Sequence, residues 1–522
     1  NSTIVLDRDY TFTEGIDSIG GITIRATNIT IDGNGHTINA LGKSLIFTVS
    51  GEKVTLKNLI LVNGGNEDVG GYDGPVVWSG HDGVVDNCTF ENNTGALNGA
   101  ITWAGQNGLI KDSLFKGNVA GDGGALYLQG KNMTVTNTTF TNNRARSGGA
   151  IYVHATEATV ENCTFRYNTA TGDGGAVYWD KKNGKISDCE FENNNAGSEG
   201  GAVFWNDVDG LVTGSKFKLN NAKDGGAVYW NKRYGKLSDC ELTNNTATNG
   251  GGAVFWNANY GTVDSSSFEN NTAKSGGAIY WDYDYGKVID STFIRNTANE
   301  DGGAIYFFEG TFTKNEQHAV DNSIFSKNSA QNNGGAMYIA AKKSSIGNST
   351  FIKNQAKDGG ALYATFEDGT ISQSVFISNS ASDEGSAIYT DEDSTPVNYC
   401  VFFEDNAKSI IYHKGSLFSR NVNANYNWWG NNITNFNQKL ANVNDDVDVN
   451  NWYVLDMTMK EGTANITLNN LFENNKITTD GNCKMPQINI TLTNENLTVA
   501  DSVILGENGY AEVDYLLKAI KG

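Results

Sequence analysis

The stretch Gly225-Gly226-Ala227-Val228-Tyr229-Trp230 decides the fold, because close copies of it recur along most of the chain. Ten of the eleven intervals between the alanines of these copies are 25 or 26 residues, and the remaining interval is 32. A period this regular means that each repeat is one structural unit, which buries its apolar face only against its neighbours. The alanines are Ala100, Ala125, Ala150, Ala176, Ala202, Ala227, Ala253, Ala278, Ala304, Ala336, Ala361 and Ala387.

Two other columns of residues keep step with the glycines. An apolar residue, nearly always phenylalanine, precedes each copy, and an asparagine follows it three residues later. The first column is Phe90, Phe115, Phe140, Phe165, Phe191, Phe217, Leu242, Phe268, Phe293, Phe325, Phe351, Phe376 and Phe402. The second is Asn93, Asn118, Asn143, Asn168, Asn194, Asn220, Asn245, Asn271, Asn296, Asn328, Asn354 and Asn379.

These columns predict an all-β fold, a right-handed parallel β-helix with coils of about 25 residues. Each short strand then pairs with its equivalent one coil along, roughly 4.8 Å away, so identical residues stack. The phenylalanines supply a stacked interior, and the asparagine side chains bond from coil to coil. A third column of Asn or Asp, such as Asn162 and Asp188, lies three residues before the phenylalanines. It predicts a turn with a left-handed residue.

Alternation along a strand predicts which side chains face inward. Val228 should point inward and Tyr229 outward. The next column, which contains Trp230, lies inside if the strand continues, or at a corner if the strand ends one residue early. We expect it inside.

Composition excludes some classes of function. The 522 residues include 61 glycines and 3 prolines, which suits short strands and tight turns, and the net charge of −21 argues against nucleic-acid binding. No apolar run approaches the roughly 18–20 residues that span a bilayer. We therefore expect no membrane span and an extracellular or cell-surface protein. Asn-X-Ser/Thr triplets such as Asn132 suggest a glycoprotein, although composition alone produces many of them.

Three domains are expected. Residues 1–74 should form an amino-terminal cap and the first coils, and residues 75–450 the regular repeats with a closing coil. Within that coil, residues 425–430 (Asn-Tyr-Asn-Trp-Trp-Gly) should cover the open end of the core with two bulky rings. Residues 451–522 alternate with period two in places, which predicts a small immunoglobulin-like β-sandwich.

The Phe-X-X-Asn and Gly-Gly-Ala-Ile elements resemble the repeats of the polymorphic membrane proteins. Their order, followed by residues 425–430 and the segment that opens with Asn451-Trp452-Tyr453, is most similar to the adhesin-like surface proteins of methanogenic archaea. The resemblance covers nearly the whole chain and implies a surface location and attachment. It is an association, because this fold also carries enzymes.

The outward aromatic column is the candidate binding face. Stacked rings one coil apart would form a long exposed strip, and exposed apolar patches of that size mark interaction sites. The alternative is that the rings only stabilise the sheet face as cross-strand pairs. Three further tyrosines, each before a glycine, extend the face in the middle coils. The face is Tyr178, Phe204, Tyr229, Phe255, Tyr280 and Tyr306, with Tyr234, Tyr260 and Tyr285 from the loops.

Residues with possible chemistry mostly have structural explanations. Five cysteines, such as Cys163 and Cys189, share a column with Ser and Thr, so we expect small buried side chains, with a disulfide between these two as the alternative. The five histidines show no ligand spacing. Asp445, Asp446 and Asp448 are either a solvated loop or a weak Ca²⁺ site, and no other cofactor is expected.

No catalytic constellation stands out, so we expect a protein that is not an enzyme. The first hypothesis is an adhesin or attachment rod that binds a glycan or protein of another cell through the long face. Self-association as the subunit of a surface filament or sheath is the second. A polysaccharide-active β-helix enzyme is the third.

Overall fold

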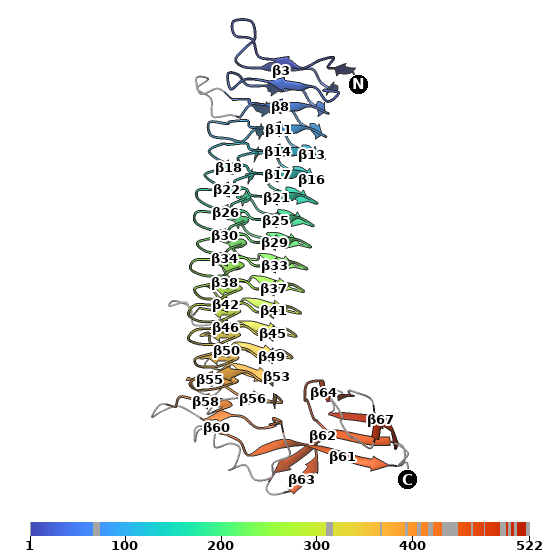
Figure 1. Ribbon diagram of the computed structural model, residues 1–522, viewed down its shortest axis with the longest axis vertical. Coiled ribbons are helices and arrows are strands. Elements are labelled where there is room, and N and C mark those ends of the chain that lie inside the picture. The colour runs from blue at the N-terminus through green and yellow to red at the C-terminus, as the bar shows by residue number, and fades with distance from the viewer. Residues whose placement is uncertain are drawn as a thin grey trace. The chain divides into compact units, whose positions relative to one another are not determined.

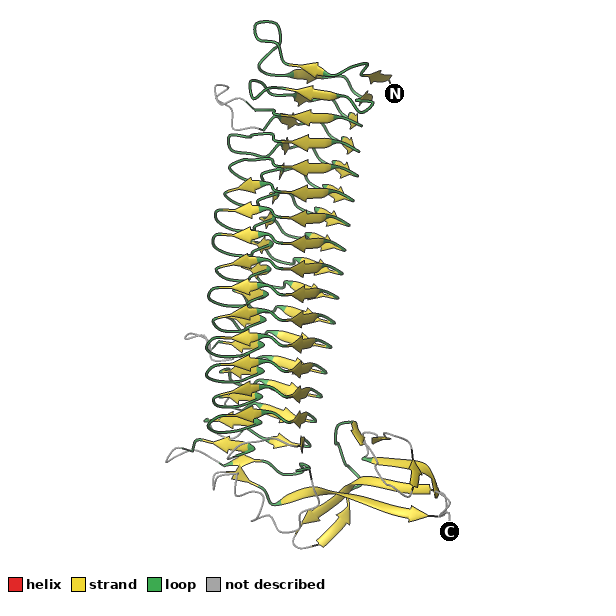
Figure 2. Ribbon diagram, viewed as in Figure 1, coloured by secondary structure: helices red, strands yellow, loops and turns green. Residues whose placement is uncertain are grey.

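The computed structural model describes residues 2–65, 74–308, 317–365, 368–391, 395–403, 409–415, 421–430, 447–460, 463–473, 476–490, 497–499, 503–505 and 509–517. Two compact units make up the chain, Asn1–Lys287 and Val288–Gly522. Figure 2 shows short strands joined by loops, and the described residues contain no helix. The all-β prediction is confirmed.

One coil of the first unit shows how every coil is built. It contains β31 (Val228–Trp230), β32 (Lys236–Ser238), β33 (Glu241–Thr243) and the short β34 (Thr246–Ala247). Each strand pairs in parallel with its equivalent one coil along, in the register that the sequence repeat predicts, such as Tyr229 with Phe255. Successive coils therefore form parallel sheets, whose strands follow one another in Figure 1.

The sheet that contains β31 carries the tryptophans and tyrosines, and we call it the aromatic sheet. In the first unit its strands are β3 (Ile22–Ile24), β6 (Phe47–Val49), β9 (Val76–Trp78), β12 (Ile101–Trp103), β15 (Leu126–Leu128), β19 (Ile151–Val153), β23 (Val177–Trp179), β27 (Val203–Trp205), β31, β35 (Val254–Trp256) and β39 (Ile279–Trp281). In the second unit they are β43 (Ile305–Phe307), β47 (Met337–Ile339), β51 (Leu362–Ala364), β55 (Ile388–Thr390) and β58 (Ile411–His413).

The interior follows the predicted alternation. Phe191 and Phe217 are completely buried, and their ring centroids lie 4.8 Å apart with nearly parallel planes. Val228 and Trp230 are also completely buried. The tryptophan column therefore lies inside the coils, as expected, and not at a corner.

The asparagine column forms a ladder in which every polar group is bonded. Asn220 Nδ2 donates to the backbone oxygen of Phe191 and to Asn245 Oδ1, both at 3.0 Å. Asn220 Oδ1 accepts from the backbone nitrogen and from Nδ2 of Asn194, again at 3.0 Å. Because a buried amide must be fully bonded to be tolerated, this ladder allows a polar residue at 1% exposure inside each coil.

Left-handed residues other than glycine stand at three corners of a coil. Asn162 (φ 52°) and Asp188 (φ 54°) confirm the predicted turn before the phenylalanine column. A second corner follows that column, at residues such as Asn193 (φ 54°). The third follows the aromatic sheet, at residues such as Asn183 (φ 58°). Asn and Asp tolerate this conformation better than other residues that carry a β-carbon.

A glycine five residues after each core tryptophan makes room for its ring. A β-carbon on Gly261 would lie 2.3 Å from Trp256 Nε1 and 2.6 Å from Trp281 Cζ2. Where the tryptophan is replaced by Leu128, the glycine is replaced by Met133. The two positions therefore share one volume in the core, which is filled either by a large and a minimal side chain or by two medium ones.

The cysteine column is structural. All six cysteines are free thiols, and those at positions 88, 163, 189, 240 and 400 are buried. The backbone nitrogen of Cys163 approaches Cys189 Sγ at 3.5 Å without a disulfide between them. Burial raises the pKa of Cys240 to about 12, so this thiol stays protonated.

The end of the second unit departs from the coil pattern. Its strands are antiparallel: β61 (Asn451–Lys460), β62 (Thr463–Glu473), β63 (Lys476–Thr479), β65 (Leu497–Val499) and β67 (Tyr510–Leu517) form one sheet, and β64 (Ile488–Ile490) pairs with β66 (Val503–Leu505). An immunoglobulin-like topology is not confirmed. The module shares a core with the last coils, in which Val401, Trp428, Tyr453 and Leu468 lie together.

The closing coil covers the core with one of the two predicted rings. Trp429 stacks on Phe402 at 4.9 Å between centroids and continues the interior column. Trp428 instead joins the core that the coils share with the antiparallel module. At the other end, residues 2–65 stack as coil strands, from β1 (Ser2–Val5) paired with β4 (Ile29–Asp32) onward, and the amino-terminal cap stays a prediction.

We expect Asn220→Ala to lower the free energy of unfolding by several kcal/mol. The substitution leaves buried donors and acceptors without partners, and each such group costs about 1–3 kcal/mol. Asn221→Ala, at an exposed neighbour, is the control and should stay within about 0.5 kcal/mol of the parent. Urea unfolding of both variants measures the difference. Equal stabilities would show that the ladder is not a stabilising element.

The shared volume gives a second prediction. Gly261→Ala should destabilise the first unit by about 1–3 kcal/mol through overpacking against Trp256. The pair Trp256→Leu with Gly261→Met, which copies Leu128 and Met133, should recover most of the loss. Thermal unfolding compares these variants with Gly20→Ala, where the added carbon has ordinary room. A pair less stable than Gly261→Ala alone would contradict the shared volume.

Candidate functional site

Three tyrosines occupy left-handed positions at the corner after the aromatic sheet. Tyr234, Tyr260 and Tyr285 have φ of 63°, 61° and 60°. The two preceding coils have Asn183 and Asp209 at this position. A tyrosine is strained there by about 1 kcal/mol or more, and strain of this kind is concentrated at functional sites. Glu157 and Lys343 are also left-handed at this corner of other coils, so what distinguishes the tyrosines is the stack that their rings form.

The three rings form an exposed stack, which we call the tyrosine corner. Ring centroids are 5.3 Å apart between Tyr234 and Tyr260, and 4.6 Å apart between Tyr260 and Tyr285. Tyr234 is 52% exposed and Tyr260 40% exposed, while Tyr285 is half-buried. Stacked rings present their edges and hydroxyls to solvent, and each end of the stack has only one neighbour within it. This arrangement suits hydrogen bonding and edge contacts along a line.

The core holds the tyrosine corner rigidly. Each tyrosine is followed by a glycine, and the glycines lie directly against the tryptophan rings of β31, β35 and β39. A β-carbon on Gly235 would meet Trp230 Cε3 at 2.6 Å, and one on Gly286 would meet Trp281 Cε2 at 2.5 Å. The backbone beneath the site is therefore packed on the interior, which is the support that a preorganised binding surface needs.

The surroundings add positive charge and another ring. Lys232 and Arg233 are exposed immediately before Tyr234. Tyr283, two residues before Tyr285, is 46% exposed. Asp209 and Asp284 stand beside them, since the backbone nitrogen of Asp209 donates to the backbone oxygen of Arg233 and that of Tyr260 to the backbone oxygen of Asp284, both at 3.2 Å. Charges of both signs therefore surround the exposed rings.

The predicted aromatic strip is a stack of rings that is partly covered: Phe204 and Tyr229 are buried, while the other four rings are half-buried. The rings of Tyr178, Phe204, Tyr229, Phe255 and Tyr280 stack at 4.7–5.2 Å. In the second unit, Tyr306 stacks on Tyr338 at 4.7 Å.

The exposure of these rings is limited because a loop lies over the column. Phe204 is only 4% exposed and Tyr229 only 5%. A β-carbon on Gly250 would meet ring atoms of Phe255 and of Tyr280, each at 2.9 Å, so the segment leading into the glycine pair covers the rings. Their faces are occupied by one another, which favours the alternative hypothesis of cross-strand stabilisation, and a binding role of this column stays a prediction.

The covering loops carry a row of carboxylates. Asp173, Glu199 and Asp224 stand immediately before three successive glycine pairs. The backbone nitrogen of Glu199 donates to Asp173 Oδ1 at 3.3 Å. Partial burial, followed by the negative charges of Asp173 and Asp224, raises the pKa of Glu199 to about 7. Burial and Asp224 likewise raise the pKa of Asp282 to about 6.

The suggested Ca²⁺ site is untested. Asp445 and Asp446 lie outside the described residues. Asp448, in β60 (Val447–Asp448), accepts a hydrogen bond from Asn421 Nδ2 at 2.9 Å. Across the described ranges, no three or more His, Cys, Asp or Glu side chains are grouped so as to hold a metal ion.

Family models match parts of the chain. A model described as "Right handed beta helix region" matches residues 11–165 and 98–201. The "Chlamydia polymorphic membrane protein" repeat matches residues 239–255, 265–280, 290–307 and 348–365. These matches confirm a right-handed parallel β-helix with repeats of the polymorphic-membrane-protein type.

The described part contains no helix long and apolar enough to span a bilayer.

Solved structures similar to the chain include tailspike proteins of E. coli bacteriophage HK620. A double mutant is 13% identical with a TM-score of 0.40, and the tailspike in complex with a pentasaccharide is 14% identical with a TM-score of 0.36. Each comparison covers 98% of this chain and 84% of the tailspike. TM-scores and sequence identities this low give no basis for inferring a shared site. No curated protein matches the chain.

The pKa of Glu199 predicts how stability depends on pH. The folded state holds this proton more tightly than the unfolded state, whose pKa is near 4.5. Stability from this group is therefore present below about pH 4.5 and is lost as the pH rises to about 7. Glu199→Gln should raise the melting temperature at pH 8 and leave it unchanged at pH 4.

The matched control is Glu241→Gln, at the exposed first residue of β33. Thermal melts at both pH values distinguish the variants. A Glu199→Gln effect of the same size at pH 4 and pH 8 would show that ionisation of this carboxyl is not the cause.

Proposed function

We propose that this protein works on the cell surface or outside the cell as a non-enzymatic attachment protein, an adhesin, and that it binds a glycan or protein of another cell through the tyrosine corner. The observation that carries the proposal is the stack of three tyrosines, two of them exposed, at left-handed positions where the two preceding coils have Asn183 and Asp209. Rings held in line on a rigid backbone suit contact with a partner.

Two other features support this proposal. The match to repeats named for a membrane protein favours a surface location. The resemblance to archaeal adhesin-like proteins agrees with attachment, and the methanogen origin stays a prediction. The parallel coils also supply a rigid base, since each left-handed tyrosine is followed by a glycine packed on a core tryptophan.

Replacing Tyr234, Tyr260 and Tyr285 together by asparagine tests the proposal. Asparagine fits the left-handed corner and copies Asn183, so the melting temperature should stay equal or rise. Binding should fall at least tenfold, because aromatic residues contribute most of the energy of many interfaces. Beads coated with the protein can be measured against a panel of whole cells and a glycan array.

Tyr167→Asn is the matched control, since Tyr167 is also left-handed (φ 55°) and 55% exposed but stands at a different corner. It should bind like the parent. Retention of full binding by the triple variant would overturn the proposal. Concentration-dependent growth of particle size in light scattering, lost in the triple variant, would instead favour the filament subunit.

A polysaccharide-active enzyme is the second candidate, and Glu199 is the observation that favours it. A carboxyl with a pKa near 7 can act as a general acid. The row of acids also gives that pKa a structural cause, namely burial beside like charges. Product analysis with bound polysaccharides decides: cleavage by the parent that Glu199→Gln abolishes would establish an enzyme and contradict our proposal of binding alone.

A further inference from the structure

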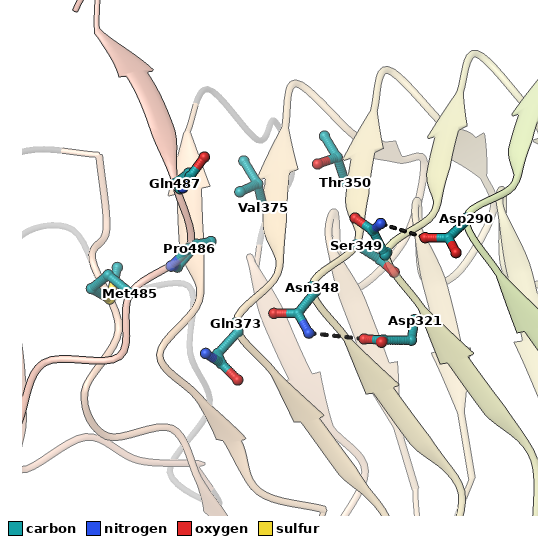
Figure 3. Close-up of a pocket in the computed structure, with 11 residues that line it drawn as sticks. Asp290, Asp321, Asn348, Ser349, Thr350, Gln373, Val375, Met485, Pro486 and Gln487 are labelled. Carbon is teal, nitrogen blue, oxygen red and sulfur yellow. Dashed lines mark hydrogen bonds between the residues drawn. The ribbon is translucent and has the colours of Figure 1, made fainter. Parts of the chain in front are cut away.

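A polar pocket of about 580 Å³ lies within the second unit, away from the tyrosine corner in sequence. One wall is the corner between β44 (Ala319–Asp321) and β45 (Ile324–Ser326), together with the same corner of the next coils. The other wall is the segment Met485-Pro486-Gln487 of the antiparallel module (Figure 3). Sites for small ligands commonly have volumes of about 300–1,000 Å³, so the pocket has room for a molecule larger than an ion.

Carboxylates and amides from successive coils line the pocket in pairs. Asn322 Nδ2 donates to Asp290 Oδ1 at 2.5 Å, and Asn348 Nδ2 donates to Asp321 Oδ1 at 2.9 Å (Figure 3). Asn322, Asn348 and the residue below them, Gln373, all have positive φ, which places their side chains at one corner. These bonds use Oδ1 of each carboxylate and fix the orientation of the first two amides.

The opposite wall is anchored and partly apolar. Met485 is 1% exposed and belongs to the core that contains Val375, Tyr453 and Leu468. Pro486 follows it with a restricted backbone. Gln487 is exposed at the mouth. The pocket therefore combines a row of hydrogen-bonding groups with an apolar surface made by Val375, Met485 and Pro486.

The lining decides which ligand fits. Its residues include two carboxylates and no Lys, Arg or His, which disfavours anions. Asp290 and Asp321 are not part of any metal-binding group found among the described residues. Planar amides and carboxylates pair well with neighbouring hydroxyls, and an apolar wall suits the C–H face of a sugar ring. We infer that this pocket binds a neutral oligosaccharide, independently of the tyrosine corner.

The test removes two side-chain amides of the pocket that take no part in the paired hydrogen bonds between its asparagines and aspartates. In the double variant Gln373→Gly with Gln487→Ala, glycine accepts the left-handed turn and the second change is on the surface, so the melting temperature should not fall. The full chain is screened on an array of neutral and anionic oligosaccharides, and calorimetry follows with the strongest neutral binder. Loss of two hydrogen bonds should weaken binding about tenfold or more.

Asn162→Gly is the matched control, because it makes the same change at the same corner of a coil in the first unit. It should bind like the parent, and so should the triple asparagine variant of the tyrosine corner. Three results would overturn the inference: no neutral oligosaccharide binds at 1 mM, the double variant binds as the parent does, or calorimetry with CaCl₂ alone shows a site that Asp290→Asn with Asp321→Asn removes. Loss of oligosaccharide binding only in the tyrosine variant would assign the sugar to that corner instead.

Discussion

The buried asparagine ladder is the constraint on which the coils depend. Each amide uses both hydrogens and both lone pairs, and it bonds backbone groups of the preceding coil and the amides of both neighbouring coils. A coil that gained or lost a residue between the phenylalanine and the asparagine would break bonds in two coils at once. The three-residue spacing therefore never varies, whereas the spacing elsewhere can.

The sequence was sufficient to predict the interior columns, in which equivalent residues of successive coils stack on one another. Phe191, Asn220 and Trp230 repeat at the coil period, and identical residues in register must face the same way. Their inward direction, the bonding of the amides and the left-handed turns could be predicted without coordinates. The cysteine column followed from its exchange with serine and threonine.

Contacts between different columns could not be predicted in this way. Phe204 and Tyr229 point outward as alternation requires, but a loop from another part of the same coil covers them. The tyrosine corner was singled out with them as one face, and the structure separates the two groups by burial and by backbone angle. The exchange of Trp and Gly for Leu128 and Met133 was a signal in the sequence that could have revealed the contact beneath that corner.

At the corner after the aromatic sheet, the buried residues recur from coil to coil while the residues on the surface vary. Strands β31, β35 and β39 end there on buried tryptophans, while the residues between them and the next glycine vary from Asn to Tyr. The chain's one interval of 32 residues also has its extra length at this corner, between Phe307 and His318. Asn206, Asn231 and Asn257, which directly follow core tryptophans, bond one another from coil to coil, so an inserted peptide has to come after them. Beyond these asparagines the corner is a natural site for display, where a row of epitopes could be set at the spacing of the coils.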